Sequence, residues 1–258
     1  MPLPPLPPPR VIGHRGAAAH APENTLAGIR KAHELGARWV EFDVQATRDN
    51  CAVLLHDPRL ERTTDGYGLL ADQEARDIAR LDAGRWFGKA FGGEAVPRFD
   101  AAMELIDGLG MGAIIEIKSG PGDGARTARA MLASLGPAAS PHIISSFGED
   151  ALAIAAAERP DMARALLVRA IPADWRVRVE RLGCSALHAG ERELTPQIVA
   201  EVALHCVLRA YTVNKPERAA QLFAWGAAAV FTDCPDVILS GIEHGTDGPR
   251  ASRGSKAQ

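Results

Sequence analysis

Cysteine is scarce in this 258-residue sequence, and long apolar runs are missing. The four cysteines stand far apart with no C-x-x-C pair, which argues against a zinc site or a disulfide framework and predicts reduced thiols. They are Cys51, Cys184, Cys206 and Cys234. No apolar run approaches the roughly 18 residues that span a bilayer. We therefore expect a cytoplasmic protein without membrane insertion.

An excess of one charge is also missing, since 29 Lys and Arg nearly balance 32 Asp and Glu, for a formal net charge of −3. Nucleic-acid binding usually needs a clustered basic face, so we expect no nucleic-acid partner. Hydrophobic residues, in contrast, are plentiful at 47% of the total. This length and composition predict one enzyme-sized domain with a sizeable core.

The two ends of the sequence differ in composition from the middle. Residues 1–10 contain six prolines and cannot form the apolar helix of a signal peptide, so we expect a stiff disordered leader. An SH3-binding segment is the alternative for this leader. Residues 244–258 are polar and rich in Gly and Ser, which predicts a disordered tail. The folded domain is therefore expected at 11–243.

Short apolar runs that predict strands alternate with segments of helical periodicity through most of residues 11–243. The first helix is expected to have Asn24 as its N-cap and to end at Gly36. The expected strands are Val11–Ile12, Trp39–Ala46, Gly112–Lys118, His142–Phe147, Ala165–Arg169, Ser185–His188, Val207–Val213 and Ala229–Thr232. The later helices are expected at Ala101–Leu109, Ala125–Leu135, Asp150–Glu158, Trp175–Leu182, Pro196–His205 and Pro216–Trp225.

Eight β–α units in about 250 residues predict an α/β fold of the TIM (β/α)8 barrel type. A doubly wound open sheet is the alternative, but the sequence lacks its G-x-G-x-x-G turn. One segment departs from the alternation. Ala52–His56 follows the second strand after fewer residues than the dozen or so of a parallel crossover, so we expect a hairpin return or extended loop. Residues 58–99 have weak periodicity and predict a small insertion after strand two.

Acidic residues stand within two of the expected strands. Glu41 and Asp43 are two residues apart and therefore share one face of their strand, and Glu116 lies inside the apolar run Ile114–Ile117. Buried carboxylates that point the same way repel unless a cation or a proton lies between them. We therefore predict one divalent cation, Ca²⁺ or Mg²⁺, bound by these hard oxygen ligands. A structural ion-pair cluster is the alternative.

Two histidines and two basic residues are expected beside these carboxylates. His14 and Arg15 end the first strand, Lys118 ends the third, and His56 lies after the second. A TIM barrel would place them all at the rim that holds its active sites. Imidazole suits proton transfer near neutral pH, so His14 and His56 are candidate catalytic residues for phosphodiester hydrolysis. Arg15 and Lys118 are candidates for binding phosphate oxygens, or for neutralising the acids.

Residues at the ends of later strands reach the same rim. His188 ends the sixth strand and is either a substrate contact or a capping residue. Tyr211 and Asn214 end the seventh and would either wall the leaving-group pocket or pack the barrel. The remaining histidines are expected to be ordinary core or surface residues: His20, His33, His142, His205 and His244.

In combination, these motifs resemble the glycerophosphodiester phosphodiesterase family, especially its cytosolic bacterial branch. The resemblance extends from Val11 to Ile242. It rests on His14-Arg15-Gly16, Pro22-Glu23-Asn24-Thr25, Glu41-Phe42-Asp43, His56-Asp57 with Arg62-Thr63-Thr64, Glu116-Ile117-Lys118, Tyr211-Thr212-Val213-Asn214 and Phe231-Thr232-Asp233. Two departures are Asn50, where the family usually has glycine in a turn, and Tyr211, where many members have tryptophan.

The resemblance implies a TIM barrel with a small insertion, a Ca²⁺ or Mg²⁺ ion held by Glu41, Asp43 and Glu116, and acid–base catalysis by His14 and His56. It implies hydrolysis of a glycerophosphodiester to glycerol 3-phosphate and an alcohol such as choline, ethanolamine or glycerol. In the mechanism usually drawn for the family, the glycerol 2-hydroxyl attacks phosphorus, and the cyclic phosphate is then hydrolysed. The expected partner is thus a small-molecule substrate.

Two other functions are alternatives to this one. A phospholipase D-like lyase acting on sphingomyelin or lysophospholipids would share the metal and both histidines, but it predicts a secreted, disulfide-linked chain. A non-catalytic barrel that binds polar head groups predicts a missing acid or histidine, and none is missing. The sequence leaves open the metal, the alcohol, the division of acid and base roles between the histidines, the oligomeric state and the role of the proline-rich leader.

Overall fold

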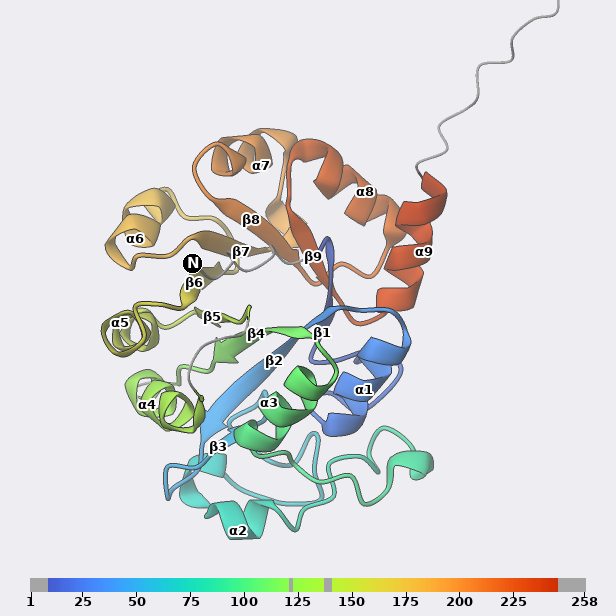
Figure 1. Ribbon diagram of the computed structural model, residues 1–258, viewed down its shortest axis with the longest axis vertical. Coiled ribbons are helices and arrows are strands. Elements are labelled where there is room, and N and C mark those ends of the chain that lie inside the picture. The colour runs from blue at the N-terminus through green and yellow to red at the C-terminus, as the bar shows by residue number, and fades with distance from the viewer. Residues whose placement is uncertain (1–8, 121–122, 137–140, 246–258) are drawn as a thin grey trace, which may run out of the picture.

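Eight parallel strands form a closed barrel in the computed structural model, which describes residues 9–120, 123–136 and 141–245 (Figure 1). Strand β1 pairs with β2 on one side and with β9 on the other, and the second pairing closes the ring. The prediction of a TIM barrel is confirmed. The strands of the ring are β1 (Val11–His14), β2 (Trp39–Ala46), β4 (Gly112–Ile117), β5 (Ile143–Ser146), β6 (Ala163–Val168), β7 (Ala186–Gly190), β8 (Val207–Tyr211) and β9 (Ala229–Thr232).

Helices surround the strands, as Figure 1 shows for α4 to α9. They are α1 (Leu26–Glu34), α3 (Phe99–Gly108), α4 (Gly124–Ser134), α5 (Glu149–Glu158), α6 (Trp175–Arg181), α7 (Pro196–Ala203), α8 (Pro216–Trp225) and α9 (Pro235–Gly245). Local signals set several of their ends. Helix α7, for example, begins at Pro196, and the side chain of Thr195 accepts a hydrogen bond from the Ile198 amide. Among the described residues, no helix combines the length and apolar character needed to cross a membrane.

The segment after β2 forms a hairpin and a small insertion. Strand β3 (Ala52–Leu54) pairs antiparallel with β2, with Val44 opposite Leu54, which confirms the expected return. The insertion contains α2 (Ala75–Ile78) and the short 3₁₀ helices η1 (Leu70–Asp72) and η2 (Lys89–Phe91), and a third such helix, η3 (Glu191–Glu193), follows β7. Leu60, Leu70 and Ile78 help to form a separate apolar cluster under the insertion. Figure 1 shows this segment beyond β3, outside the ring of helices.

One face of each strand fills the barrel interior, because successive side chains point to opposite sides of a sheet. The interior apolar cluster consists of Ile12, Trp39, Ile114, Ile143, Ala165, Ala186, Ala229 and Phe231, with Tyr211 packed against it. Two residues beyond Trp39 on β2 comes Glu41, and two beyond Ile114 on β4 comes Glu116. The interior face is therefore apolar low in these strands and charged near their C-terminal ends.

The N-cap of the first helix differs from the prediction. Thr25, not Asn24, has the extended backbone of an N-cap, and its Oγ1 accepts a hydrogen bond from the Gly28 amide at 3.0 Å. Asn24 is instead in a left-handed conformation, with φ 55°. Sequence alone cannot decide which of two adjacent capping residues is the N-cap. Here the side chain of Asn24 contacts Asp43, which leaves Thr25 as the N-cap.

The ends of the domain were predicted from composition. Helix α9 continues to Gly245, so His244 is helical rather than part of a tail. A helix here follows from the barrel itself, because the last strand also needs an outer cover. Residues 1–8 and 246–258, which include nearly all of the proposed leader and tail, lie outside the described residues. Their predicted disorder stays a prediction.

Candidate active site

A cavity of about 440 Å³ opens at the C-terminal ends of the strands. Its lining includes most of the residues predicted from sequence to form the site: His14, Arg15, Glu41, His56, Glu116, Lys118, His188 and Tyr211. The ninth, Asp43, lies beside them and is almost completely buried. Asn214 does not line the cavity, and its side chain contacts Thr232 and Asp233 instead. The structure therefore brings the predicted catalytic, metal-binding and substrate-binding candidates to one place.

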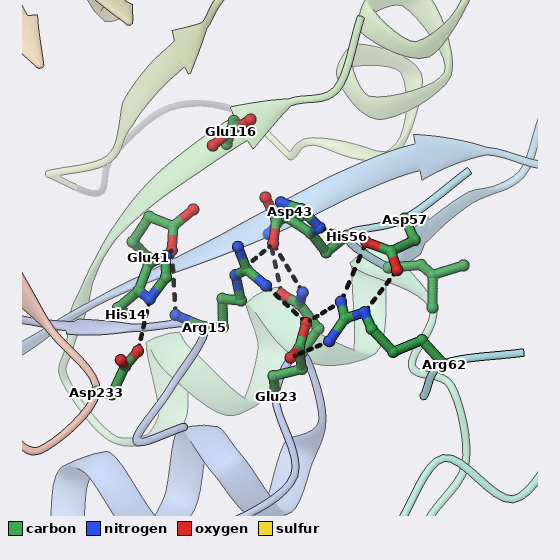
Figure 2. Close-up of polar contacts among 12 residues, drawn as sticks. His14, Arg15, Glu23, Glu41, Asp43, His56, Asp57, Arg62, Glu116 and Asp233 are labelled. Carbon is green, nitrogen blue, oxygen red and sulfur yellow. Dashed lines mark hydrogen bonds and ion pairs between the residues drawn. The ribbon is translucent and has the colours of Figure 1, made fainter. Parts of the chain in front are cut away.

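Three buried carboxylates meet at one edge of this cavity. One oxygen from each of Glu41, Asp43 and Glu116 lies within 4.8 Å of the other two. The parallel register pairs Asp43 directly with Glu116 across β2 and β4. Figure 2 shows the three side chains turned toward a common space. A metal ion with oxygen ligands fits such a group.

The electrostatics of these carboxylates also favour a cation. Burial, together with the charge of Asp43, raises the pKa of Glu41 to about 8. The same two causes raise the pKa of Glu116. Burial opposes ionisation of Asp43 as well, but Lys118 and Arg15 outweigh it and hold its pKa well below its usual range. Thus the two nearby cations stabilise one carboxylate fully, while the charge of the other two is left poorly compensated.

Lys118 and Arg15 hold the carboxylate group together. The Lys118 Nζ lies 2.8 Å from Glu116 Oε1 and 3.2 Å from Asp43 Oδ1. The Arg15 Nε lies 3.3 Å from Asp43 Oδ2, and its Nη1 donates to Glu23 Oε1 at 2.8 Å. Both basic side chains remain at the cavity surface, where they are available to an anion.

His14 is oriented by a residue that sequence reasoning left without a role. Its Nδ1 lies 2.7 Å from Asp233 Oδ1, and the amide of Asn214 donates to Asp233 Oδ2 at 2.6 Å. Burial opposes protonation of His14, but the hydrogen bond to Asp233 and the charge of Glu41 raise its pKa above the ordinary value. Asp233 directly follows β9, the neighbour of β1, so its place at the end of a barrel strand was the signal for this contact.

His56 lies at the other side of the carboxylates and has a carboxylate of its own. Its Nδ1 is 2.6 Å from Asp57 Oδ1. Arg62 of the insertion donates to both Asp57 and Glu23, and Glu23 in turn binds Arg15 (Figure 2). Burial lowers the pKa of His56, and the charge of Asp43 offsets this only in part. The insertion thus contributes Arg62 to the network that fixes His56 and Arg15.

Asn24 is a second site residue that sequence reasoning placed elsewhere. Its Nδ2 donates to Asp43 Oδ2 at 2.8 Å, and its Oδ1 accepts from the Asp43 backbone amide at 3.0 Å. This paired contact fixes the orientation of the Asp43 carboxylate. The left-handed backbone of Asn24 directs its side chain toward Asp43 rather than toward the start of the helix.

The loop after β1 has little space. Gly16 has φ +91°, and a Cβ atom there would lie 2.5 Å from the backbone carbon of Gly28. We expect Gly16→Ala to lower the free energy of unfolding by about 1–2 kcal/mol for the conformation and about 1–3 kcal/mol more for the contact. Urea denaturation measures this.

Gly93 offers a matched control for Gly16, because it has φ +87° but nothing within 4 Å of a built Cβ. Gly93→Ala should lose only the conformational part, about 1–2 kcal/mol. Equal losses for the two variants would show that the close approach of Gly16 to Gly28 does not contribute to stability.

His188 and Tyr211 occupy the far side of the cavity. His188 has no exposed surface, and its Nε2 lies 3.0 Å from Arg209 Nη1. Tyr211 donates its hydroxyl hydrogen to the Val168 carbonyl at 2.8 Å, so it presents mainly its ring. The Phe147 ring packs edge-on against it, with ring centroids 6.2 Å apart. Sequence reasoning did not identify Arg209, although it interrupts the apolar strand β8 and shares the strand face of Tyr211.

Fold and site together define a TIM barrel with a candidate active site at the C-terminal ends of its strands, and comparisons with known proteins identify its family. Residues 14–237 match the model of the glycerophosphoryl diester phosphodiesterase family. A glycerophosphodiester phosphodiesterase of Caldanaerobacter subterraneus subsp. tengcongensis is 32% identical over 241 residues, which cover 91% of this chain and 98% of that protein. One from Bacillus subtilis is 31% identical over 247 residues, with 88% and 84% covered.

A solved structure agrees with these sequences. A phosphodiesterase of Oleispira antarctica, determined in complex with its product sn-glycerol-3-phosphate, is 38% identical, has a TM-score of 0.88, and is matched over 91% of this chain and 97% of its own. The chain belongs to the glycerophosphoryl diester phosphodiesterase family, and its activity is the hydrolysis of glycerophosphodiesters.

Proposed function

We propose that this enzyme hydrolyses glycerophosphodiesters to glycerol 3-phosphate and an alcohol, with one bound divalent cation and with His14 and His56 as the proton-transfer groups. The observation that supports this most is the convergence of three buried carboxylates and two carboxylate-bound imidazoles on a single cavity. Cytoplasmic location, which the sequence suggests, stays a prediction.

Glu41, Asp43 and Glu116 would hold the cation, either Ca²⁺ or Mg²⁺. Their donor atoms are all carboxylate oxygens, which suit hard cations, and their spacing lets one ion reach all three. When bound, the cation supplies positive charge that stabilises the negative charge growing on the phosphate in the transition state. The raised pKa values of Glu41 and Glu116 fit a site that lacks this charge without the ion.

Arg15 and Lys118 would bind the phosphodiester. Both stand at the cavity surface beside the carboxylates, and ion pairs with Asp43 hold each of them in place. A guanidinium suits two phosphate oxygens at once, while an ammonium acts as a point charge. Because their contacts with the acids already fix both side chains, little conformational entropy would be lost when the anion binds.

His14 and His56 would exchange protons with the attacking and the leaving oxygen. Each imidazole has Nδ1 bound to a carboxylate, Asp233 or Asp57, which leaves Nε2 for the substrate. The Oleispira antarctica relative was solved with sn-glycerol-3-phosphate, which supports a small-molecule substrate of this type here. His188 and Tyr211 would contact the part of the substrate that extends away from the cation.

The test is an assay of glycerol 3-phosphate with purified protein. Glycerophosphocholine, glycerophosphoethanolamine and glycerophosphoglycerol would be offered with a chelator, and then with Ca²⁺ or Mg²⁺ added back. We expect turnover only with a divalent cation. Release of glycerol 3-phosphate at the same rate in excess chelator would remove the metal from the proposal. No product under any divalent condition would count against the whole reaction.

A further inference from the structure

The side of the cavity away from the carboxylates has its own chemistry. We call it the distal half and define it by Ser145, Phe147, Arg169, His188 and Tyr211, which come from β5 to β8 or directly follow these strands. The carboxylates belong to β2 and β4, and the distal half begins beside them, because β5 pairs with β4 and Ser145 lies opposite Glu116 in their register. A diester bound at the carboxylates would have room for one of its two substituents in the distal half.

The distal half contributes positive charge, and the carboxylate beside it, Glu116, is paired with Lys118. Arg169 is exposed at its rim, directly after β6. Arg209 lies buried beside His188, on the adjacent strand. No described carboxylate lies within ion-pair distance of either guanidinium. Burial lowers the pKa of Arg209 to about 10, so it still carries its charge at neutral pH.

Arg209 also fixes which nitrogen of His188 bears hydrogen. A guanidinium can only donate, so the contact of Arg209 Nη1 with His188 Nε2 at 3.0 Å makes Nε2 the acceptor. The neutral ring must then carry its hydrogen on Nδ1. That atom is buried and has no hydrogen-bond partner among the described residues. His188 thus offers a donor that nothing in the described protein satisfies.

Ser145 is a second group of this kind. Its Oγ is buried and has no partner within the described part of the chain, and like His188 it lines the cavity. Buried polar groups without partners are unfavourable and therefore rare. Two in one cavity, above a buried arginine, indicate that a polar ligand supplies the missing hydrogen bonds.

We propose that the distal half binds the alcohol group of the substrate and selects an uncharged, hydroxyl-bearing alcohol, such as glycerol, over a cationic one, such as choline or ethanolamine. This rests on the proposed function. Hydroxyl groups can accept from His188 Nδ1 and exchange hydrogen bonds with Ser145. A cationic group would instead meet the charge of Arg169 at the rim and that of Arg209 behind His188, while the adjacent carboxylate, Glu116, is already paired with Lys118. The rings of Phe147 and Tyr211 provide an apolar wall for the carbon chain of the alcohol.

The experiment compares kcat/KM for glycerophosphoglycerol and glycerophosphocholine under the same divalent-cation condition. We expect a ratio of about tenfold or more in favour of the glycerol ester. Arg169→Ala should lower this ratio, and Arg169→Glu should lower it further by raising kcat/KM for the choline ester. Arg192→Ala is the control, since Arg192 is exposed after β7 and does not line the cavity. It should leave the ratio unchanged.

A kcat/KM ratio near one, or a ratio that Arg169→Glu does not change, would overturn the inference. Release of glycerol 3-phosphate in the same assay would still support the proposed function. Nitrogen NMR of the imidazoles gives a second readout that needs no turnover. The signals lost in His188→Gln should belong to a ring with hydrogen on Nδ1 and none on Nε2. The opposite tautomer would overturn the assigned donor.

Discussion

Replacing His14 or His56 by alanine is expected to lower kcat for glycerophosphodiester hydrolysis about 10²- to 10⁴-fold, the usual contribution of a positioned acid or base. Each ring lies at the cavity, and a carboxylate at Nδ1 fixes its orientation. Alanine removes the proton-transfer atom but leaves the strand ends in place. The measurement is kcat on the best substrate, with thermal unfolding as the check that the barrel is intact.

His205→Ala is the control for these two variants. His205 is exposed and precedes β8, at the end of the barrel opposite the cavity. Its replacement should leave kcat within about twofold of the parent. If His14→Ala or His56→Ala retains a rate within about tenfold of the parent, that histidine is not a proton-transfer group.

The site residues that could be predicted share a local signal. Glu41, Asp43 and Glu116 interrupt apolar strands, and a period of two together with the barrel rule places them at one rim. The same rule applies to His14, because it ends a strand. Such predictions need only the strand direction and the closure of the ring. They do not need the positions of individual side chains.

Three residues of the sequence motifs had no assigned role in the site, because their roles depend on contacts between separate segments of the chain. Asp233 reaches His14 across 219 positions of sequence, and only the pairing of β9 with β1 brings them together. Arg62 lies in an insertion with weak periodicity, so nothing local places it beside Asp57 and Glu23. Asn24 has the residue type and position of an N-cap. Its side chain instead donates a hydrogen bond to the Asp43 carboxylate, and this contact is visible only in three dimensions.

Glu41→Gln should lower metal-dependent turnover by about 10²-fold or more, since charge stabilisation by a bound metal is worth several kcal/mol. Glutamine keeps an oxygen for the Arg15 amide, which donates to Glu41 Oε2 at 3.1 Å, but it removes one of the three negative charges. The stabilisation of the folded protein by excess Ca²⁺ or Mg²⁺ should fall with it. Thermal unfolding with and without the cation measures that loss.

The same substitution should make the metal-free protein more stable, and more so at higher pH. Burial and the charge of Asp43 raise the pKa of Glu41 from 4.5 in the unfolded chain to about 8. Between these values the unfolded chain releases a proton that the folded protein keeps, so the stability contributed by this group falls as pH rises. Glutamine does not titrate, so the variant lacks this decrease in stability with rising pH. We expect Glu41→Gln to gain of the order of 1–3 kcal/mol over the parent at pH 8 relative to pH 5.

Urea denaturation in excess chelator at the two pH values measures this difference. Glu104→Gln is the matched control, because Glu104 is exposed on α3 and lies outside the carboxylate group. It should give the same pH dependence as the parent. A Glu41→Gln variant that loses turnover yet shows the parent's pH dependence would mean that Glu41 is already ionised without metal, held by His14 and Arg15. The carboxylates would then be balanced by the protein's own cations, and the electrostatic reason for a divalent ion at this site would disappear.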